Sequence, residues 1–379
     1  MHIANITEEG RGGGPLFGMR TSTIELNKLG VKNTILLPKR FSEKFSNQLK
    51  EDGINHYQFP LHHLTRYLPH LISYVLWFIP EIFILVRHLQ KQDYKVLMCN
   101  GSYQIKGIIA AKIAGLPTIW HMNDSQMPGP IHWLYKLIAP LATSYMFASE
   151  KSKQYYGDLC PKILEKANEV IQSPINITKF AHTKSGQTKL ATTDGLKIIT
   201  VSYLNANKNV ELIIKAIPKM SDMIDKPVHL YIVGPIVDSQ KAYKNHLDTI
   251  IEEENIQNVH FLGYRSDIPE LLTDADVYVC SSNFESSPIA VWEAMVNGTM
   301  VITTDVGDVR SIVEKNNAGI VIDTGAVDQL VDALQIAADS AQNQAFREKG
   351  KSVALQYFDA EKIASQIKEF AQRIASQDS

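Results

Sequence analysis

The sequence has little cysteine and lacks the patterns of several protein classes. Its three cysteines, Cys99, Cys160 and Cys280, lie far apart and form no CxxC pair. This spacing argues against a disulfide framework and against a cysteine zinc site, so we expect buried thiols in a reducing cytosol. The first residues show no basic segment followed by an apolar run, so no signal peptide is expected. Low-complexity segments and fixed-period repeats are also lacking, which disfavours disordered and solenoid proteins.

A GxGxxG fingerprint is lacking as well. Gly12, Gly13 and Gly14 follow the first expected strand, HIANIT, and precede an amphipathic segment from Phe17 to Leu29. Glycine permits positive φ and a close approach of the backbone to a ligand. A plain flexible turn explains a run of glycines equally well. The missing fingerprint disfavours a nicotinamide enzyme.

The length of 379 residues suits two domains, and 45% hydrophobic with 21% charged residues is typical of globular proteins. The net charge of -2 is unevenly distributed. Residues 1–175 hold 19 Lys and Arg against 13 Asp and Glu, whereas the remainder holds 19 against 27. A basic first half indicates an anionic partner, such as phospholipid head groups or an acidic acceptor. Ordinary variation in surface charge is an equal alternative.

Short apolar strands alternate with helical stretches, and the alternation restarts halfway along the chain. This pattern predicts two parallel sheets with right-handed crossovers, in an N-terminal domain over 1–175 and a C-terminal domain over 190–358. Residues 172–195, rich in Ser, Thr, Lys and Gly, are typical of a linker. The expected strands are HIANIT, TILLP, YKVLMCN, PTIWHM and SYMFAS in the first domain, and LKIITVS, VHLYIVG, VHFLG, DVYVCS, TMVITT and GIVI in the second.

Residues 64–86 form the longest apolar stretch of the sequence. Arg66, Glu81 and two prolines, Pro69 and Pro80, interrupt it, so a transmembrane helix is disfavoured. We expect one or two helices that pack mainly into the first domain's core. Contact with a membrane surface is the second interpretation.

The most informative stretch is residues 283–307, NFESSPIAVWEAMVNGTMVITTDVG. Ser287 and Pro288 have the sequence of a helix start, with a hydroxyl cap and proline at the first helical position. The amide groups of a helix N-terminus can bind a diphosphate. Glu293 would lie one to two turns into the helix, where its carboxylate can accept two hydrogen bonds from a ribose diol. Glu285, eight residues earlier, would lie beside a sugar. Two surface glutamates flanking a helix start fit this spacing as well.

This stretch resembles the hallmark of glycosyltransferase family 4, in which a Glu, seven residues and a second Glu precede an Ala-Met/Gly/Thr-Asp-Val-Gly tail. VSYLNANKNVELIIKA and NVHFLGYRSDIPELLTDADVYVCSS resemble further segments of that family, and the similarity extends over residues 195–325. The resemblance implies retaining enzymes with the GT-B fold, an α/β architecture of two Rossmann-like domains whose parallel sheets face each other across a cleft. It also implies that the amphipathic helix over 359–376 packs back on the first domain.

The family's roles carry over to matching positions. Glu285 would contact hydroxyls of the donor sugar, Glu293 would hold the ribose diol, and Lys208 would bind the diphosphate. In the first domain, His121 at the end of PTIWHM would act near the donor sugar. A structural histidine is the alternative for His121. Further donor-binding positions implied by the resemblance are Ser287, Pro288, Ile289 and Ala290 near the phosphates, Gly263, Tyr264 and Arg265 near the base, and Gly13 and Gly14 facing the cleft.

Tyr203 departs from the family, which usually has an arginine five residues before the lysine. A phenol donates one hydrogen bond but brings no positive charge. Another basic residue would then compensate, with Arg265 and Arg11 as candidates, or the rate is low, or the donor is held differently.

The resemblance thus predicts a glycosyltransferase that uses a UDP-sugar, with a GDP-sugar as second choice, and a polysaccharide or lipid-linked acceptor. No nucleic-acid partner, cofactor or metal is expected, and Asp274-Ala275-Asp276 is interpreted as a strand-edge sequence rather than a metal-binding DxD. We expect a cytoplasmic protein with peripheral contact at the inner face of the membrane through its first domain. Alternatives are an inactive scaffold of the same fold, for which Tyr203 is the best evidence, and an epimerase or phosphorylase.

Overall fold

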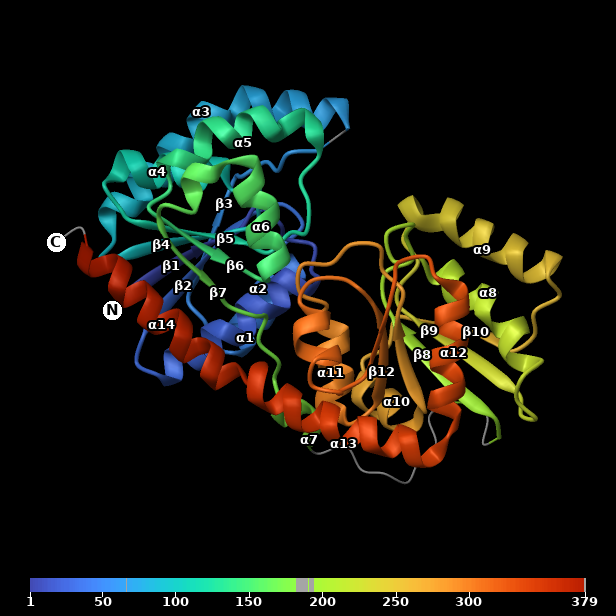
Figure 1. The fold of residues 1–379 in the computed structure, drawn as a ribbon. Coiled ribbons are helices and arrows are strands. Elements are labelled where there is room, and N and C mark those ends of the chain that lie inside the picture. The colour runs from blue at the N-terminus through green and yellow to red at the C-terminus, as the bar shows by residue number, and fades with distance from the viewer. Residues whose placement is uncertain (66, 182–189, 191–193, 378–379) are drawn as a thin grey trace. The chain divides into compact units, whose positions relative to one another are not determined.

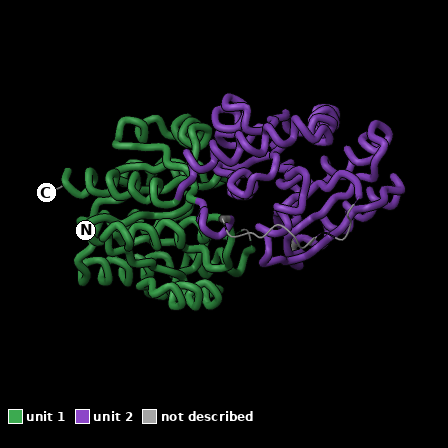
Figure 2. Tube along the Cα trace, turned by 90° about the horizontal axis from the view of Figure 1, so that it is seen from below, with its two compact units in different colours: residues 1–174, 360–379 green, residues 175–359 purple. Residues whose placement is uncertain are grey.

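The computed structural model describes residues 1–65, 67–181, 190 and 194–377. The chain divides into two compact units, unit 1 with residues 1–174 and 360–379 and unit 2 with residues 175–359 (Figure 2). Each unit is built on one parallel sheet covered by helices (Figure 1), so the predicted α/β class with two parallel sheets is confirmed.

From residue 175 on, the described part of the expected linker belongs to unit 2. Ile175 pairs with Asp359 in a parallel β-bridge, and a short helix, α7 (Thr178–Ala181), follows. Residues 182–189 and 191–193 of the expected linker lie outside the described residues.

Unit 1 contains seven parallel strands in the order β3-β2-β1-β4-β5-β6-β7. The interior strands are buried on both faces, and such strands appear in a sequence as continuous apolar runs. The two edge strands, HYQF and ANEV, are not predicted from the sequence, because most of their residues are exposed or half-buried and no apolar run marks them. The strands are β1 (His2–Ile6), β2 (Lys32–Pro38), β3 (His56–Phe59), β4 (Val96–Asn100), β5 (Thr118–Met122), β6 (Ser144–Phe147) and β7 (Ala167–Val170).

The helices of unit 1 include the last helix of the chain. Its apolar residues Ile367, Phe370 and Ile374 are buried in one cluster with Ile3 and Met98 of the sheet, so this C-terminal helix completes the core of unit 1. The helices of unit 1 are α1 (Gly14–Lys28), α2 (Glu43–Glu51), α3 (Leu68–Lys91), α4 (Ile105–Ala114), α5 (His132–Ile138), α6 (Glu150–Leu159) and α14 (Ala360–Gln377).

Helix α3 corrects the expectation for the long apolar stretch. It is a single helix with Pro80 inside it, and its first half is mostly exposed rather than packed into the core. Its second half packs through residues such as Ile82, Leu85 and Leu89, which join the core cluster beside α4. From the first half, Tyr74 is buried and Phe78 packs against the same cluster. By length and composition α3 could cross a membrane, and only 28% of its most apolar window is buried.

Unit 2 contains six parallel strands in the order β10-β9-β8-β11-β12-β13. All six are predicted by the sequence, because each has an apolar run. The strands are β8 (Leu196–Val201), β9 (Val228–Val233), β10 (Val259–Gly263), β11 (Val277–Cys280), β12 (Met300–Thr304) and β13 (Ile320–Ile322). Besides α7, the helices are α8 (Val210–Ser221), α9 (Lys241–Glu253), α10 (Ile268–Asp274), α11 (Ile289–Asn297), α12 (Val327–Ala338) and α13 (Ser340–Tyr357).

Candidate active site

Two loops of unit 2, after the neighbouring strands β8 and β11, are joined by asparagine hydrogen bonds. The Nδ2 of Asn207 donates to the Phe284 carbonyl at 2.9 Å, and its Oδ1 accepts from the Phe284 amide at 3.1 Å. The Asn283 amide donates to the Asn207 carbonyl at 2.7 Å. Because the carboxyl ends of adjacent parallel strands share one edge of the sheet, these loops lie where ligands of open sheets bind.

The joined loops bring Lys208 against Glu285. The Lys208 ammonium donates to Glu285 Oε1, which also accepts from Ser282 Oγ at 2.9 Å. The two charged side chains remain 26% and 19% exposed, so a ligand can reach the pair. Burial opposes the charge of Lys208, but the Glu285 carboxylate outweighs burial and raises the pKa of Lys208. The cation therefore stays charged at neutral pH, as binding of a diphosphate requires.

The start of α11 differs from the predicted helix start. Pro288 is the residue before the helix rather than its first residue, and Ser287 makes no capping hydrogen bond. Ser287 Oγ instead accepts from the indole of Trp292 at 3.0 Å. The Ile289 amide donates to the Ser287 carbonyl at 2.9 Å, while the Ala290 amide donates to no acceptor among the described residues. The amide of Ala290 is thus open to an anion.

Glu293 lies in the middle of α11 and accepts no hydrogen bond from the described residues. Burial raises the pKa of Glu293 to about 7, and the positive charge of Lys179 opposes that rise. Two further buried hydroxyl groups of unit 2, those of Ser202 after β8 and Ser286 before α11, also have no partner in the described structure. Buried polar groups are normally hydrogen-bonded, so unpartnered ones point to a ligand that supplies the bond.

Gly307 allows the loop after β12 to lie against the loop before α11. Its φ is 51°, and a Cβ at this position would stand 2.3 Å from the Ser286 carbonyl oxygen. Only glycine fits both the conformation and the space. The glycine of the family-like Asp-Val-Gly tail therefore fixes the backbone around Ser286.

The positions expected near the base lie at the end of β10. Gly263 has a φ of 64° and accepts from the Gly234 amide at 2.9 Å, and Tyr264 is 66% exposed. Arg265 donates to both carboxylate oxygens of Asp267, at 2.8 and 2.6 Å. Its charge is therefore already paired, which weakens Arg265 as the replacement for the missing arginine. Tyr203 itself is 41% exposed.

The remaining predicted residues belong to unit 1. His121 on β5 is in register with Asn100 on β4, and its Nδ1 lies 3.0 Å from Asn100 Oδ1. Its Nε2 is buried without a partner in the described structure, and burial lowers the pKa of His121 to about 4. His121 is therefore a neutral imidazole at neutral pH.

The glycine-rich turn of unit 1 ends earlier than expected. Gly12 and Gly13 have φ values of 109° and 113°, which favour glycine, whereas Gly14 is the first residue of α1. Arg11, the second candidate to compensate for Tyr203, is paired with Glu9 at 2.7 Å. Both proposed compensating arginines thus already have a carboxylate partner in their own loops.

The two aspartates of the DxD-like sequence accept hydrogen bonds from backbone amides. Asp274 accepts from the Leu190 amide at 2.7 Å, and Asp276 accepts from the Lys197 amide at 2.8 Å. Among the described residues, no group of three or more His, Cys, Asp or Glu side chains could hold a metal ion.

Sequence reasoning misses Asn207 and Ser282, which position the Lys208–Glu285 pair. Asn207 is the middle one of three asparagines at alternate positions shortly after a predicted strand, and polar residues at that place are a usable signal. Ser282 offers no such signal in the sequence, because a serine after a buried strand is common. Its partner, Glu285, lies three residues away.

Residues 183–353 match the family model described as glycosyl transferases group 1. The N-acetyl-alpha-D-glucosaminyl L-malate synthase of Bacillus anthracis is 26% identical over 216 residues, which cover 54% of each chain. The UDP-Gal:alpha-D-GlcNAc-diphosphoundecaprenol alpha-1,3-galactosyltransferase of Escherichia coli is 24% identical over 67% of this chain and 69% of that protein. The match thus spans about half the length of the first relative.

Solved structures resemble the whole chain. Anabaena Alr3699/HepE in complex with UDP and glucose superimposes with a TM-score of 0.84 at 20% identity, over 98% of this chain and 100% of that one. Sucrose-phosphate synthase from Thermosynechococcus elongatus gives a TM-score of 0.81 at 18% identity, over 99% of each chain.

Proposed function

Residues 183–353 match the glycosyl transferases of group 1 and the chain has the GT-B fold, and from this premise we propose that it belongs to that group and transfers a sugar from a UDP-sugar to a lipid-linked or glycan acceptor with retention of configuration. One observation supports the donor site above all others. Lys208 follows β8, while the open amide of Ala290 and the unpartnered carboxylate of Glu293 belong to α11, which follows the neighbouring strand β11. Cation, amide and carboxylate match the diphosphate and ribose of a nucleotide-sugar.

In the proposed reaction, negative charge grows on the leaving diphosphate while the sugar becomes oxocarbenium-like. Lys208 and the amide of Ala290 stabilise that charge, so no step requires a metal. Glu285 holds Lys208 in place and binds hydroxyls of the donor sugar. We leave Glu285 unassigned as a nucleophile, because same-face attack assisted by the leaving phosphate gives retention as well.

Titration calorimetry with UDP, GDP and their sugar conjugates tests the donor class. We expect UDP to bind the wild-type chain and Glu293→Ala to weaken binding by about tenfold or more, since a hydrogen bond to a charged group contributes about 1.5–3 kcal/mol. Glu252→Ala, an exposed glutamate on α9, is the matched control. Equal binding by both variants would remove Glu293 from the donor site, and binding of GDP alone would change the donor class.

An inactive scaffold is the second candidate, because Tyr203 stands where the family has an arginine. Incubation of the wild-type chain with a UDP-sugar and an assay of released UDP separate the two candidates. Slow donor hydrolysis that depends on Lys208 favours an enzyme, and UDP binding without any turnover favours the scaffold.

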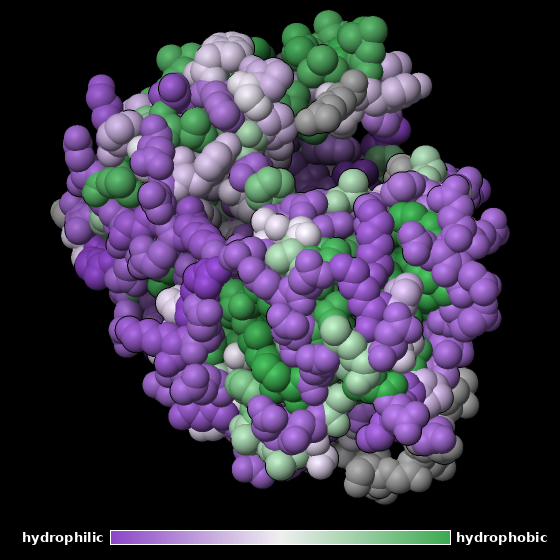
Figure 3. Space-filling view, turned by 45° about the vertical axis from the view of Figure 1, so that its right-hand side comes forward, coloured by the Kyte–Doolittle hydropathy of each residue, from purple (hydrophilic) through white to green (hydrophobic). Residues whose placement is uncertain are grey.

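The relatives' names favour an acceptor carried by a lipid, because two of them act on diphospho-undecaprenol sugars. In unit 1, Leu68, Ile72, Val75, Leu76, Ile79 and Phe83 recur at helical spacing along α3 and are all more than half exposed; they form the apolar face of α3. Figure 3 shows hydrophobic residues exposed together at the top of the view, where α3 lies. We propose that this face contacts the inner surface of the membrane in a cytoplasmic protein.

Cosedimentation with phosphatidylglycerol vesicles at low salt tests the membrane contact. We expect the double variant Leu76→Glu/Phe83→Glu to lose most binding, because burying each large apolar side chain stabilises the bound state by about 1.5–3 kcal/mol. Ile113→Glu, an exposed apolar residue on α4, should bind like the wild type. If the wild-type chain does not bind the vesicles, the proposed membrane contact is wrong.

A further inference from the structure

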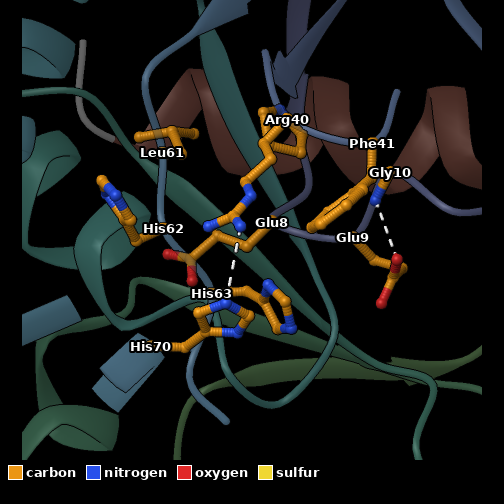
Figure 4. Close-up of a pocket in the computed structure, with 10 residues that line it drawn as sticks. Glu8, Glu9, Gly10, Arg40, Phe41, Leu61, His62, His63 and His70 are labelled. Atoms are coloured by element: carbon orange, nitrogen blue, oxygen red, sulfur yellow. Dashed lines mark hydrogen bonds between the residues drawn. The ribbon is translucent and has the colours of Figure 1, made fainter. Parts of the chain in front are cut away.

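Unit 1 has a hollow at the carboxyl ends of β1, β2 and β3, which we call the histidine pocket. It encloses about 360 Å³ of empty space, its open mouth included. Figure 4 shows its side chains converging from three loops. The residues that matter below are Glu8 after β1, Arg40 and Phe41 after β2, and His62, His63 and His70 after β3.

Two positions of the backbone around this pocket, Phe41 and Gly10, are tightly constrained. Phe41 has a φ of 63°, a conformation that a bulky side chain rarely adopts. A Cβ on Gly10 would lie 2.9 Å from the Ser42 Cβ, so the first loop packs closely on the second. Backbone strain of this kind persists only where surrounding contacts impose it, and it concentrates at ligand sites.

Positive and titratable nitrogen groups dominate the pocket. Arg40 makes no ion pair with the described residues; it lies over the Phe41 ring at 4.9 Å, and its Nη2 is 3.4 Å from His70 Nε2. His63 Nε2 lies 3.4 Å from Arg11 Nη2. In both contacts the guanidinium can only donate and the imidazole nitrogen accepts, so the histidines hold the arginines in place without neutralising their charge.

The two acids of the pocket do not cancel this positive charge. Both oxygens of Glu9 accept hydrogen bonds from Arg11, so the pair is locally neutral. Glu8 is 5% exposed, and its oxygens accept no well-formed hydrogen bond in the described structure. Burial raises the pKa of Glu8 to about 8, although Lys106 opposes the rise. At neutral pH Glu8 is therefore mostly a protonated acid, which can donate a hydrogen bond to an anion.

The pocket borders the apolar face of α3. His70 lies in the first turn of α3, between Leu68 and Ile72 of that face, and Trp77 of the same helix stacks on His62 with 6.4 Å between ring centroids. A charged group bound by the histidines would thus sit next to exposed apolar side chains. This arrangement fits an anionic head group on a lipid chain.

We propose that the histidine pocket binds a phosphate or diphosphate group, with Arg40 and His70 as its principal ligands and Glu8 as a hydrogen-bond donor. The proposal rests on the proposed function in one respect, that the group belongs to the acceptor rather than to the donor. A soluble phosphorylated compound carries the same chemistry, so the test has one arm for each source.

The first arm titrates inorganic diphosphate into the full chain at saturating UDP, which occupies the donor site of unit 2. We expect binding by the wild type and a loss of about tenfold or more in Arg40→Ala, because charge-assisted hydrogen bonds disappear. His70→Ala should weaken binding as well. Arg87→Ala is the matched control, since Arg87 is an exposed arginine of α3 outside the pocket. Thermal unfolding of each variant checks that it is folded.

The second arm uses phosphatidylcholine vesicles that contain either polyprenyl diphosphate or the uncharged polyprenol. Stronger flotation with the diphosphate lipid, lost in Arg40→Ala and kept in Arg87→Ala, assigns the pocket to a lipid-linked acceptor. Arg40-dependent binding of inorganic diphosphate alone assigns it to a soluble phosphorylated compound. Equal behaviour of Arg40→Ala and Arg87→Ala in both arms overturns the proposal. UDP binding, measured in the same series, reports separately on the proposed function.

Discussion

Lys106 of unit 1 and Lys208 of unit 2 are both held by glutamates, but in opposite settings. Lys106 on α4 is fully buried; its ammonium donates to Glu81 at 2.6 Å, lies 3.4 Å from Glu8, and stands 4.3 Å above the centre of the Tyr74 ring. Lys208 is partly exposed and pairs with one carboxylate at the edge of its sheet. An enclosed lysine can only hold its own unit together, whereas an open one can exchange its partner for a ligand.

The same contrast separates the polar sites of the two units. In unit 2, the two buried serine hydroxyls that lack partners in the described structure follow β8 and β11, the strands after which the open lysine and its glutamate also lie, and the local sequence carries the family's motif. In unit 1, the buried cluster of Lys106, Glu81 and Glu8 lies beneath the histidine pocket, and Glu8 and His62 belong to both. Unit 1 thus fixes its pocket from below with a buried charge network.

Removing Lys106 should produce the largest effect. Lys106→Met leaves Glu81 buried without its lysine partner, and the loss of one partner of a buried ion pair costs about 3–5 kcal/mol. We expect hydrogen exchange of the amides of β1, β4 and α4 to accelerate strongly while those of unit 2 keep their protection. Lys112→Met, an exposed lysine of the same helix, is the control. If these amides keep their hydrogen-exchange protection in Lys106→Met, Lys106 does not hold unit 1 together, and the proposed difference between the two lysines is wrong.

Removing Lys208 should leave the fold almost intact and affect catalysis. Lys208→Met deletes a partly exposed pair, so we expect little change in the urea midpoint. Loss of one group that stabilises the developing charge should lower the turnover of UDP-sugar by about 100- to 1000-fold. Lys215→Met serves as control, because Lys215 on α8 pairs with Glu211 on the exposed face of that helix. Strong destabilisation by Lys208→Met would make this lysine structural like Lys106.

The two lysines also show how far the sequence could predict the molecule. The interior strands and Lys208 are predicted because apolar runs and the spacing around Glu285 are local patterns. The cluster of Lys106, Glu81 and Glu8 leaves no such pattern, since its members come from three distant segments that only the fold brings together. The exposed first half of α3 escapes prediction for a related reason, because composition does not reveal which apolar face finds a partner.

The start of α11 shows a finer limit. Ser287 and Pro288 have the composition of a cap and a first helical residue, yet the indole of Trp292 takes the serine hydroxyl and the helix begins one residue later. A competing side chain five residues away decides this outcome. Sequence rules for helix ends do not include such tertiary competition.

The smallest expected effect concerns the pH dependence of UDP binding. Burial raises the pKa of Glu293 to about 7, so this group binds protons more tightly in the folded chain than in the unfolded one. Stability without ligand should therefore decrease as the pH rises toward and through 7. The ribose hydroxyls need the ionised carboxylate as acceptor, so UDP affinity should rise over the same range.

Calorimetric titration of UDP at pH 6 and pH 8 measures this change. Because about a tenth of Glu293 is ionised one pH unit below its pKa, affinity should increase by about tenfold across the interval. Glu293→Gln should bind weakly and should show only the change due to the phosphates of UDP itself, which makes it the reference for the wild type. Parallel pH profiles of the two proteins would mean that Glu293 does not accept a hydrogen bond from the ribose. The contrast between an open and an enclosed polar group would then rest on Lys208 and Lys106 alone.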